Sequence, residues 1–315
     1  MLTKNQFVRS HGLGNDYIVM DPASLSFKLT SQNIIRVCNR NTGVGSDGIL
    51  ALEKSETSEA KLRIYNPDGS EAEKSGNGLR IFCKFLFEHG YTEKTFFEVE
   101  TAGGKVQAQL HVMLGKAPSV TVEMGKATFD AAIIPVSGFT GEVVEKPLKI
   151  ASLNRELKVT CVSVGNPHCV VFYDDINLAE KEIHTLGTLL ENHPQFPNRS
   201  NVQFVKVNNE KEITIRIWER GAGYTLASGS SSCAAVSACV KTGRTGRDLT
   251  VHMPGGDLSI KVSDQFDLTM KGPVEEIAVG TVTGELLETL EKNAKACVSP
   301  LDRAGFYLNR PIPPF

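Results

Sequence analysis

Two serines in this chain each stand before a glycine at the predicted start of a helix. Ser75 opens the stretch SGNGLRIFCKFLFEHG and Ser228 opens SGSSSCAAVSACVKTG, and both stretches are apolar and end at glycine. Backbone N–H groups at a helix N-terminus lack partners and favour negative charge. Each serine is therefore a candidate helix cap, nucleophile or proton-transfer group beside a site suited to an anion.

The stretches around the two serines echo each other at a nearly constant spacing. A Gly-Asn pair precedes an apolar run in HGLGNDYIVMD and again, 151 residues later, in SVGNPHCVVFYDD. Asn66 lies nine residues before Ser75, as Glu219 lies nine residues before Ser228, at an offset of 153. A repeat of this length indicates a duplicated, domain-sized unit rather than a solenoid.

Short alternating stretches around the two helices are typical of strands, among them KLRIYN, KTFFEVET, SVTVEM, LKVTCVSV, EITIRIWER and LSIKV. The pattern predicts an α+β fold of two pseudo-symmetric lobes, each a curved, mostly antiparallel sheet around a central helix. We expect an active-site cleft between the lobes. The expected divisions are an N-terminal lobe (1–140), a C-terminal lobe (141–290) whose last strand is a candidate to return to the first lobe, and a C-terminal extension (291–315).

The composition argues against several classes of partner. The chain has 315 residues, 41% of them hydrophobic, with 34 Lys and Arg against 36 Asp and Glu. This balance predicts no binding of nucleic acid and no membrane surface. The start MLTKNQFVRS is polar and no apolar run reaches membrane-spanning length, so we expect a cytoplasmic protein. The seven cysteines include no CxxC pair, and we expect reduced, mostly buried thiols without a metal site.

Two helix mouths related by a pseudo-twofold axis would face one bound molecule from opposite sides. The amides of Gly76-Asn77 and Gly229-Ser230 would then hold a carboxylate. One side chain would remove a proton from a carbon while the other delivers a proton to the opposite face, which inverts a stereocentre. This two-base chemistry implies no cofactor, but the carbanion needs close electrostatic support.

Six motifs carry a resemblance to a known family. In order, from residue 11 to residue 235, they are HGLGNDYIVMD, GVGSDGIL, YNPDGSEAEKSGNGLR, VSVGNPHCVVF, FPNRSNVQFVKV and ERGAGYTLASGSSSCAA. Together they resemble diaminopimelate epimerase, the cofactor-independent enzyme that interconverts LL- and meso-diaminopimelate on the route to lysine and peptidoglycan. The wider group that is similar in fold includes proline racemases and hydroxyproline epimerases.

The resemblance implies a role for the polar residues of these motifs. Ser75 and Ser228 occupy the two proton-transfer positions, with His168 beside the reacting carbon. Arg220 would clamp a carboxylate, and Glu219 would take an ammonium or poise the catalytic residue. The residues expected to bind substrate are Asn15, Asn66, Gly76, Asn77, Asn166, Asn201, Glu219, Arg220, Gly229 and Ser230.

Some of these residues also have a purely structural interpretation. Asn15 and Asn66 lie in sequences typical of turns, and a lone histidine such as His168 is often structural. We interpret Asp47 and Asp68 as turn formers. The adjacent charges at the end of IRIWER are harder to explain as solvated surface alone.

The chain departs from the family at both catalytic positions, where the family has cysteine and this sequence has Ser75 and Ser228. A cysteine titrates at about pH 8.5, and lower at a helix N-terminus, whereas a serine hydroxyl needs an adjacent base. Cys83 and Cys233 lie eight and five positions further on, more than one helical turn, so neither replaces the expected thiol. Lys74 is the one apparent base beside Ser75.

Three interpretations of the serines stay open. The serines are engineered replacements that hold substrate without turnover, or they belong to a natural paralogue with altered or weakened chemistry. In the third interpretation the chain is a non-catalytic binding protein. A related racemase, epimerase or dehydratase of another amino acid is the alternative enzyme. The resemblance also implies a small-molecule amino-acid substrate and a homodimer.

Overall fold

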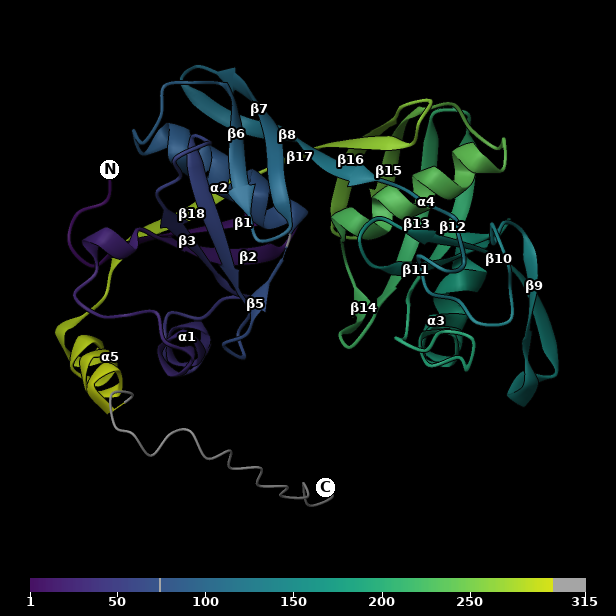
Figure 1. Ribbon diagram of the computed structural model, residues 1–315, viewed down its shortest axis with the longest axis horizontal. Coiled ribbons are helices and arrows are strands. Elements are labelled where there is room, and N and C mark those ends of the chain that lie inside the picture. Colours follow the sequence, from purple (N-terminus) through teal and green to yellow (C-terminus); the bar gives the residue numbers. More distant parts are fainter. Residues whose placement is uncertain (74, 297–315) are drawn as a thin grey trace.

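The computed structural model describes residues 1–73 and 75–296. Lys74, the candidate base, lies outside the described residues, as do residues 297–315 of the predicted C-terminal extension. Figure 1 shows two lobes side by side, the first in purple and blue and the second in teal and green.

The first lobe contains one copy of the repeated unit. Its elements are β1 (Gln6–Gly12), β2 (Asn15–Met20), a 3-10 turn (Pro22–Ser24), α1 (Ser31–Cys38), β3 (Ile49–Glu53), β4 (Ala60–Tyr65), β5 (Glu71–Ala72), α2 (Gly76–Glu88), β6 (Phe96–Thr101), β7 (Gly104–Met113) and β8 (Lys116–Lys126). Strands β2 and β3 pair in parallel, as do β4 and β6, and the other pairs are antiparallel.

The second lobe repeats this order. Its elements are β9 (Lys146–Ile150), a 3-10 turn (Ala151–Leu153), β10 (Arg155–Ser163), β11 (Pro167–Phe172), α3 (Ile176–Glu191), β12 (Asn201–Asn209), β13 (Glu212–Glu219), β14 (Gly223–Thr225), α4 (Gly229–Lys241), β15 (Asp248–Met253), β16 (Gly256–Val262) and β17 (Asp267–Pro273). When β10 is matched to β1, the parallel pairs β11–β12 and β13–β15 correspond to β2–β3 and β4–β6 of the first lobe. The predicted α+β fold of two pseudo-symmetric lobes is confirmed.

Each lobe wraps its sheet around one helix, α2 in the first and α4 in the second (Figure 1). Every residue of α2 from Asn77 to Leu86 is buried, and so is every residue of α4 from Ser231 to Cys239. A helix that is apolar on all sides is typical of a core position. In α4 the buried hydroxyls of Ser232 and Ser237 donate to carbonyls one turn earlier, at 2.8 Å and 2.7 Å, and Oγ of Ser231 accepts from Nε2 of Gln203 at 3.0 Å.

Strands of the two lobes pair with each other at the centre of the molecule. Strand β8 pairs antiparallel with β17, from Lys126–Asp267 to Ser119–Pro273. The chain then returns to the first lobe, where β18 (Glu275–Thr281) pairs antiparallel with β1 and α5 (Gly284–Ala296) follows. The Nδ2 of Asn33 in α1 donates to the carbonyl of Leu290 in α5 at 2.8 Å. Among the described helices, none has the length and apolar character needed to span a membrane.

Candidate active site

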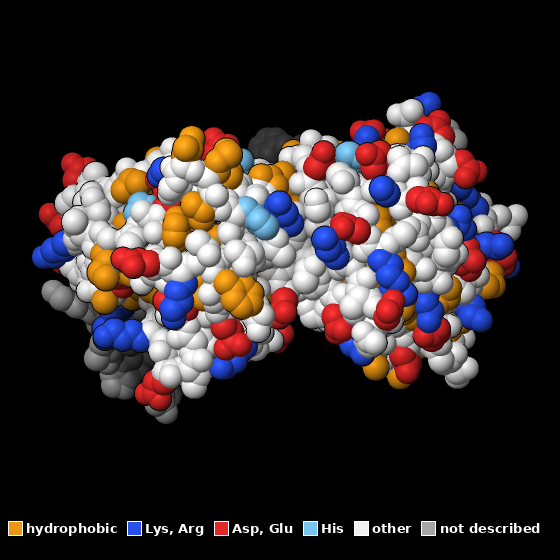
Figure 2. All heavy atoms as spheres, turned by 90° about the horizontal axis from the view of Figure 1, so that it is seen from above, with side chains coloured by type: hydrophobic (Ala, Val, Ile, Leu, Met, Phe, Trp, Pro, Cys, Tyr) orange, Lys and Arg blue, Asp and Glu red, His pale blue; other side chains and the backbone are white. Residues whose placement is uncertain are grey.

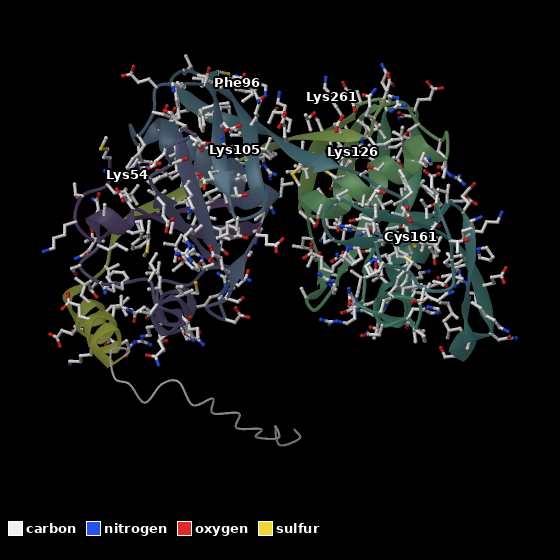
Figure 3. The ribbon with its side chains drawn as sticks, in the orientation of Figure 1. Lys54, Phe96, Lys105, Lys126, Cys161 and Lys261 are labelled. Carbon is white, nitrogen blue, oxygen red and sulfur yellow. The ribbon has the colours of Figure 1, made fainter. Side chains whose placement is uncertain are left out.

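A cavity of about 1000 Å³ lies between the lobes. Figure 2 shows the molecule narrowing at this level, and Figure 3 labels Lys126, a lining residue at the end of β8. The predicted site residues that line the cavity are Asn15, Asn66, Ser75, Gly76, Asn77, Asn166, Glu219, Arg220, Ser228, Gly229 and Ser230. His168 and Asn201 are the predicted residues that do not line it.

The two helix mouths meet at the floor of the cavity. A Cβ placed on Gly229 would lie 4.0 Å from the Cα of Gly76, so the first turns of α2 and α4 touch. Met270 of β17 fills the remaining space: its Cε would lie 2.6 Å from a Cβ on Gly76, and its Sδ 2.9 Å from one on Gly229. Glycine at both positions thus allows the two N-termini to converge on one ligand.

Ser75 caps α2 and has a second hydroxyl beside it. Its Oγ accepts from the backbone N–H of Gly78 at 3.0 Å and lies 3.2 Å from the Oη of Tyr17. Burial raises the pKa of Tyr17, and the bond to Ser75 only partly offsets this. Tyr17 lines the cavity but was not among the predicted site residues. The available sequence signal was its hydroxyl, two positions after Asn15 in an otherwise apolar strand.

Ser228 caps α4 and has a carboxyl group beside it. Its Oγ lies 3.5 Å from both the N–H of Ser231 and the Oγ of Ser230. Burial raises the pKa of Glu219, while a hydrogen bond with Ser228 lowers it. The two predicted proton-transfer positions therefore differ: a phenol stands beside one and a carboxyl beside the other.

His168 lies behind the cavity wall rather than on it. The ring is fully buried, with Nε2 2.9 Å from Oδ1 of Asn166 and Nδ1 3.0 Å from Nε2 of Gln203. Burial lowers the pKa of His168 to about 3, so the ring is neutral at physiological pH. With the Gln203 amide donating to Nδ1, the ring donates from Nε2 and fixes the side chain of Asn166 in the cavity wall.

The remaining asparagines divide into two groups. Asn77 donates to Oδ1 of Asn15 at 3.1 Å, and Asn15 donates to Oδ2 of Asp47 at 3.0 Å, which forms a chain along the first-lobe wall. Asp47, interpreted from sequence as a turn former, thus also lines and supports the site. Asn66 bonds the nearby Ser70 at 2.9 Å, as a turn residue would.

Asn201 acts on Arg220 rather than on the cavity. Its Nδ2 donates to the carbonyl of Pro167 at 2.9 Å, and its Oδ1 accepts from the backbone N–H of Arg220 at 3.0 Å. The guanidinium of Arg220 donates to the carbonyl of Asn198 at 2.9 Å. Asn201 therefore fixes the backbone from which Arg220 reaches the cavity.

Glu191, which the sequence analysis did not predict, also anchors the turn that carries Glu219 and Arg220. The Glu191 carboxylate, at the end of α3, accepts from Nε1 of Trp218 at 2.8 Å and from the N–H of Gly221 at 2.8 Å. These two donors flank the Glu219-Arg220 pair in the chain. Glu191 is only 6% exposed, so its bonds are shielded from water.

Comparison with known proteins places this arrangement in a family. The family model described as diaminopimelate epimerase matches residues 7–130 and 160–277. The chain belongs to the diaminopimelate epimerase family. It is 45% identical to diaminopimelate epimerase 2 of Nostoc sp. over 89% of this chain and 96% of that protein. It is 41% identical to diaminopimelate epimerase of Pelotomaculum thermopropionicum, over 87% of this chain and 97% of that protein.

Solved structures show the same fold at much lower identity. A hydroxyproline epimerase from Agrobacterium vitis matches with a TM-score of 0.65 at 16% identity, over 90% of this chain and 92% of that one. A probable proline racemase from Agrobacterium radiobacter matches with a TM-score of 0.64 at 15% identity, over 89% and 93%. These likenesses support the two-lobed architecture of the epimerase family member described here.

Proposed function

We propose that this chain epimerises diaminopimelate between its LL and meso forms without a cofactor, in a form weakened by serine at both proton-transfer positions. The observation that carries the proposal is the convergence of two capped helix mouths on one cavity, with Gly229 against Gly76. The names of relatives 40–45% identical to this chain support the choice of substrate.

In the proposed mechanism the substrate carboxylate binds the amides of the two first turns, which point into the cavity. Ser75 then faces one side of the α-carbon and Ser228 the other. When Ser228 is the acceptor, its hydroxyl passes its own proton to the Glu219 carboxylate as its oxygen takes the α-proton. The Ser75 hydroxyl delivers its proton to the opposite face and is reprotonated from Tyr17 or solvent. The helix N-termini stabilise the negative charge that develops on the carboxylate.

The far end of the substrate would lie against the second-lobe wall. Arg220 is placed to hold the distal carboxylate, and Asn166, oriented by His168, to bond the distal amino-acid group. Asn201 would contribute by fixing the Arg220 backbone. This division assigns direct contact to the lining residues and orientation to the two buried ones.

The hydroxyl partners support weakened rather than normal turnover. Tyr17 beside Ser75 has a raised pKa, so it is a poor acceptor for the serine proton. Glu219 beside Ser228 is the better acceptor, because a carboxyl group loses its proton at much lower pH than a phenol and is then free to accept the serine proton. Neither pair equals a thiolate at a helix N-terminus.

The test is exchange of the α-proton in D₂O, followed by NMR with LL- and meso-diaminopimelate. The chain as given is compared with the Ser75→Cys/Ser228→Cys variant. We expect rapid exchange and epimerisation only in the double-cysteine variant. Equal exchange by both would contradict the weakening, and binding without exchange in both would favour a non-catalytic binding protein.

We further propose a cytoplasmic homodimer with lobes over 1–140 and 141–290, of which β18 and α5 pack on the first lobe. The six described cysteines are all buried, which suits reduced thiols. Strand β18 lies at the edge of the first-lobe sheet and exposes Ile277 and Val279, 48% and 49% exposed. An edge strand that exposes apolar side chains is a template for pairing with a second copy.

A further inference from the structure

Arg80 is a charged side chain buried in the core beneath the cavity. It lies on α2, is 0% exposed, and its pKa is set by burial and by the Cys233 thiol rather than by a carboxylate. Burial lowers the pKa of Arg80 to about 10, so the guanidinium stays charged at neutral pH. A buried cation without a carboxylate is costly, so it calls for another explanation than folding stability.

The hydrogen bonds of Arg80 go to the first helix mouth. Its Nη2 donates to Oδ1 of Asn77 at 2.8 Å, and its Nη1 lies 3.3 Å from the carbonyl of Gly76. Asn77 in turn donates from Nδ2 to Oδ1 of Asn15 at 3.1 Å. Arg80 therefore fixes the start of α2 and two side chains of the cavity wall.

Two glycines hold the guanidinium in place. A Cβ on Gly12, at the end of β1, would lie 3.0 Å from Nη2, and one on Gly272 of β17 would lie 3.0 Å from Nε and Cζ. Its Nη1 also lies 3.6 Å from Sδ of Met270, the residue that packs against both helix mouths. The charge thus lies against the first mouth and, through Met270, behind the second.

Only one helix carries this cation. The residue of α4 that corresponds to Arg80, at the 153-residue offset between Ser75 and Ser228, is Cys233. We propose that Arg80 is a positioning residue that orders Asn77 and Gly76 and keeps a single positive charge beneath both helix mouths. A fixed cation there stabilises an anion at either mouth, whether a substrate carboxylate or an ionised group at position 75.

The inference rests on the proposed function for the reaction, but its test needs no substrate. A Ser75→Cys variant supplies a thiol at the first mouth, and its alkylation by iodoacetamide is followed from about pH 6 to about pH 10. Peptide-resolved mass spectrometry separates this thiol from the buried ones. The ionisable groups that line the cavity or act on Tyr17 remain unchanged in every variant; among the described residues they are Asp16, Tyr17, Asp47, Glu73, Lys126, Glu219 and Arg220.

Adding Arg80→Met removes the charge and should slow alkylation at pH 7 on the order of tenfold, because the thiol pKa rises. Arg80→Lys keeps the charge and should restore most of the rate. The matched control is Lys84→Gln, one turn further along α2, whose ammonium is already paired with Oε1 of Glu88 at 2.6 Å. It should leave the alkylation profile unmoved.

A folded Arg80→Met variant with an unmoved alkylation profile would overturn the inference, and so would an equal shift in Lys84→Gln. Should Arg80→Met fail to fold, Arg80→Gln keeps a polar end without charge and is judged by the same profile. A shifted profile without epimerisation in the double-cysteine variant would refute the proposed substrate and leave the role of Arg80 intact. Epimerisation by the double-cysteine variant, together with an alkylation profile that Arg80→Met does not shift, would support the proposed substrate and refute the role of Arg80.

Discussion

At the scale of single residues, the hydroxyls of Ser75 and Ser228 share a helix-capping geometry but differ in their neighbours. Ser75 accepts from Gly78 and contacts the Tyr17 phenol, while Ser228 contacts Glu219. A serine oxygen has two lone pairs and one proton, so each neighbour limits which way the proton can move. The asymmetry favours Ser228 as the stronger proton acceptor of the two.

Glu219 gives a prediction about pH. Desolvation raises the pKa of its carboxyl above the ordinary value of 4.5, so folding favours the protonated form. Its contribution to stability is fully present below pH 4.5 and is lost as the pH rises through the folded-state value. Glu219→Gln, which carries no charge, should therefore raise the free energy of unfolding at pH 7 while impairing epimerisation in the double-cysteine variant.

Urea unfolding at several pH values measures this effect. The gain from Glu219→Gln should shrink as the pH falls toward 4.5. Glu212→Gln, on the same strand but exposed, is the control and should change stability little at any pH. A Glu219→Gln variant that is less stable than its parent at pH 7 would contradict the desolvation of the Glu219 carboxylate.

At the scale of elements, the cavity walls depend on loops that are anchored from behind. The β13–β14 turn carries Glu219 and Arg220 and is held by Glu191 of α3 and by Asn201 of β12. Such anchoring fixes a polar pair in place and limits the entropy lost when substrate binds. The turn is thus an extension of the second-lobe core rather than a free loop.

Replacing Glu191 should therefore affect both stability and binding. Glu191→Gln places an amide N–H against donors that need an acceptor, and should cost about 1–3 kcal/mol of unfolding free energy. It should also raise the KM of the double-cysteine variant, because Arg220 loses its fixed position. The matched control is Glu180→Gln on the same helix. The Glu180 carboxylate is 49% exposed in its pair with Arg216, so this change should matter by less than about 0.5 kcal/mol. Equal effects of the two variants would contradict the anchoring role.

How much of this was predictable from sequence follows from how local each signal is. The caps and the glycines after them are short-range signals that recur at an offset of 153 residues, and they predicted two equivalent helix mouths. Tyr17 reaches Ser75 across 58 positions and Glu191 reaches Trp218 across 27, and no local pattern marks such pairs. The burial of His168 behind Asn166 likewise depends on Gln203, a neighbour 35 positions away.

At the scale of the whole molecule, the two lobes share a continuous sheet through β8 and β17, and α5 returns to cover the first lobe. Figure 2 shows apolar side chains on the surface of that lobe. The edge strand β18 adds Ile277 and Val279 to its exposed apolar surface. We therefore place the interface of the proposed homodimer on the first lobe.

Substituting the edge strand tests the homodimer. Ile277→Lys/Val279→Lys places two charges on β18 and should convert dimers to monomers in sedimentation equilibrium. Ile133→Lys, at a 63% exposed position outside the first-lobe edge, should leave the mass unchanged. A monomeric parent chain, or a dimer that survives the double substitution, would show that β18 is not the interface.

The central claim is that positions 75 and 228 face opposite sides of one α-carbon, and single-cysteine variants test it most directly. Ser75→Cys and Ser228→Cys are each incubated in D₂O with LL- and with meso-diaminopimelate, and exchange is followed at the reacting centre. Each variant has one thiolate on one face of the α-carbon, so it should exchange the α-proton of one epimer only and leave the configuration of that carbon unchanged. The two variants should act on opposite epimers. Exchange of the same epimer by both variants would contradict the account.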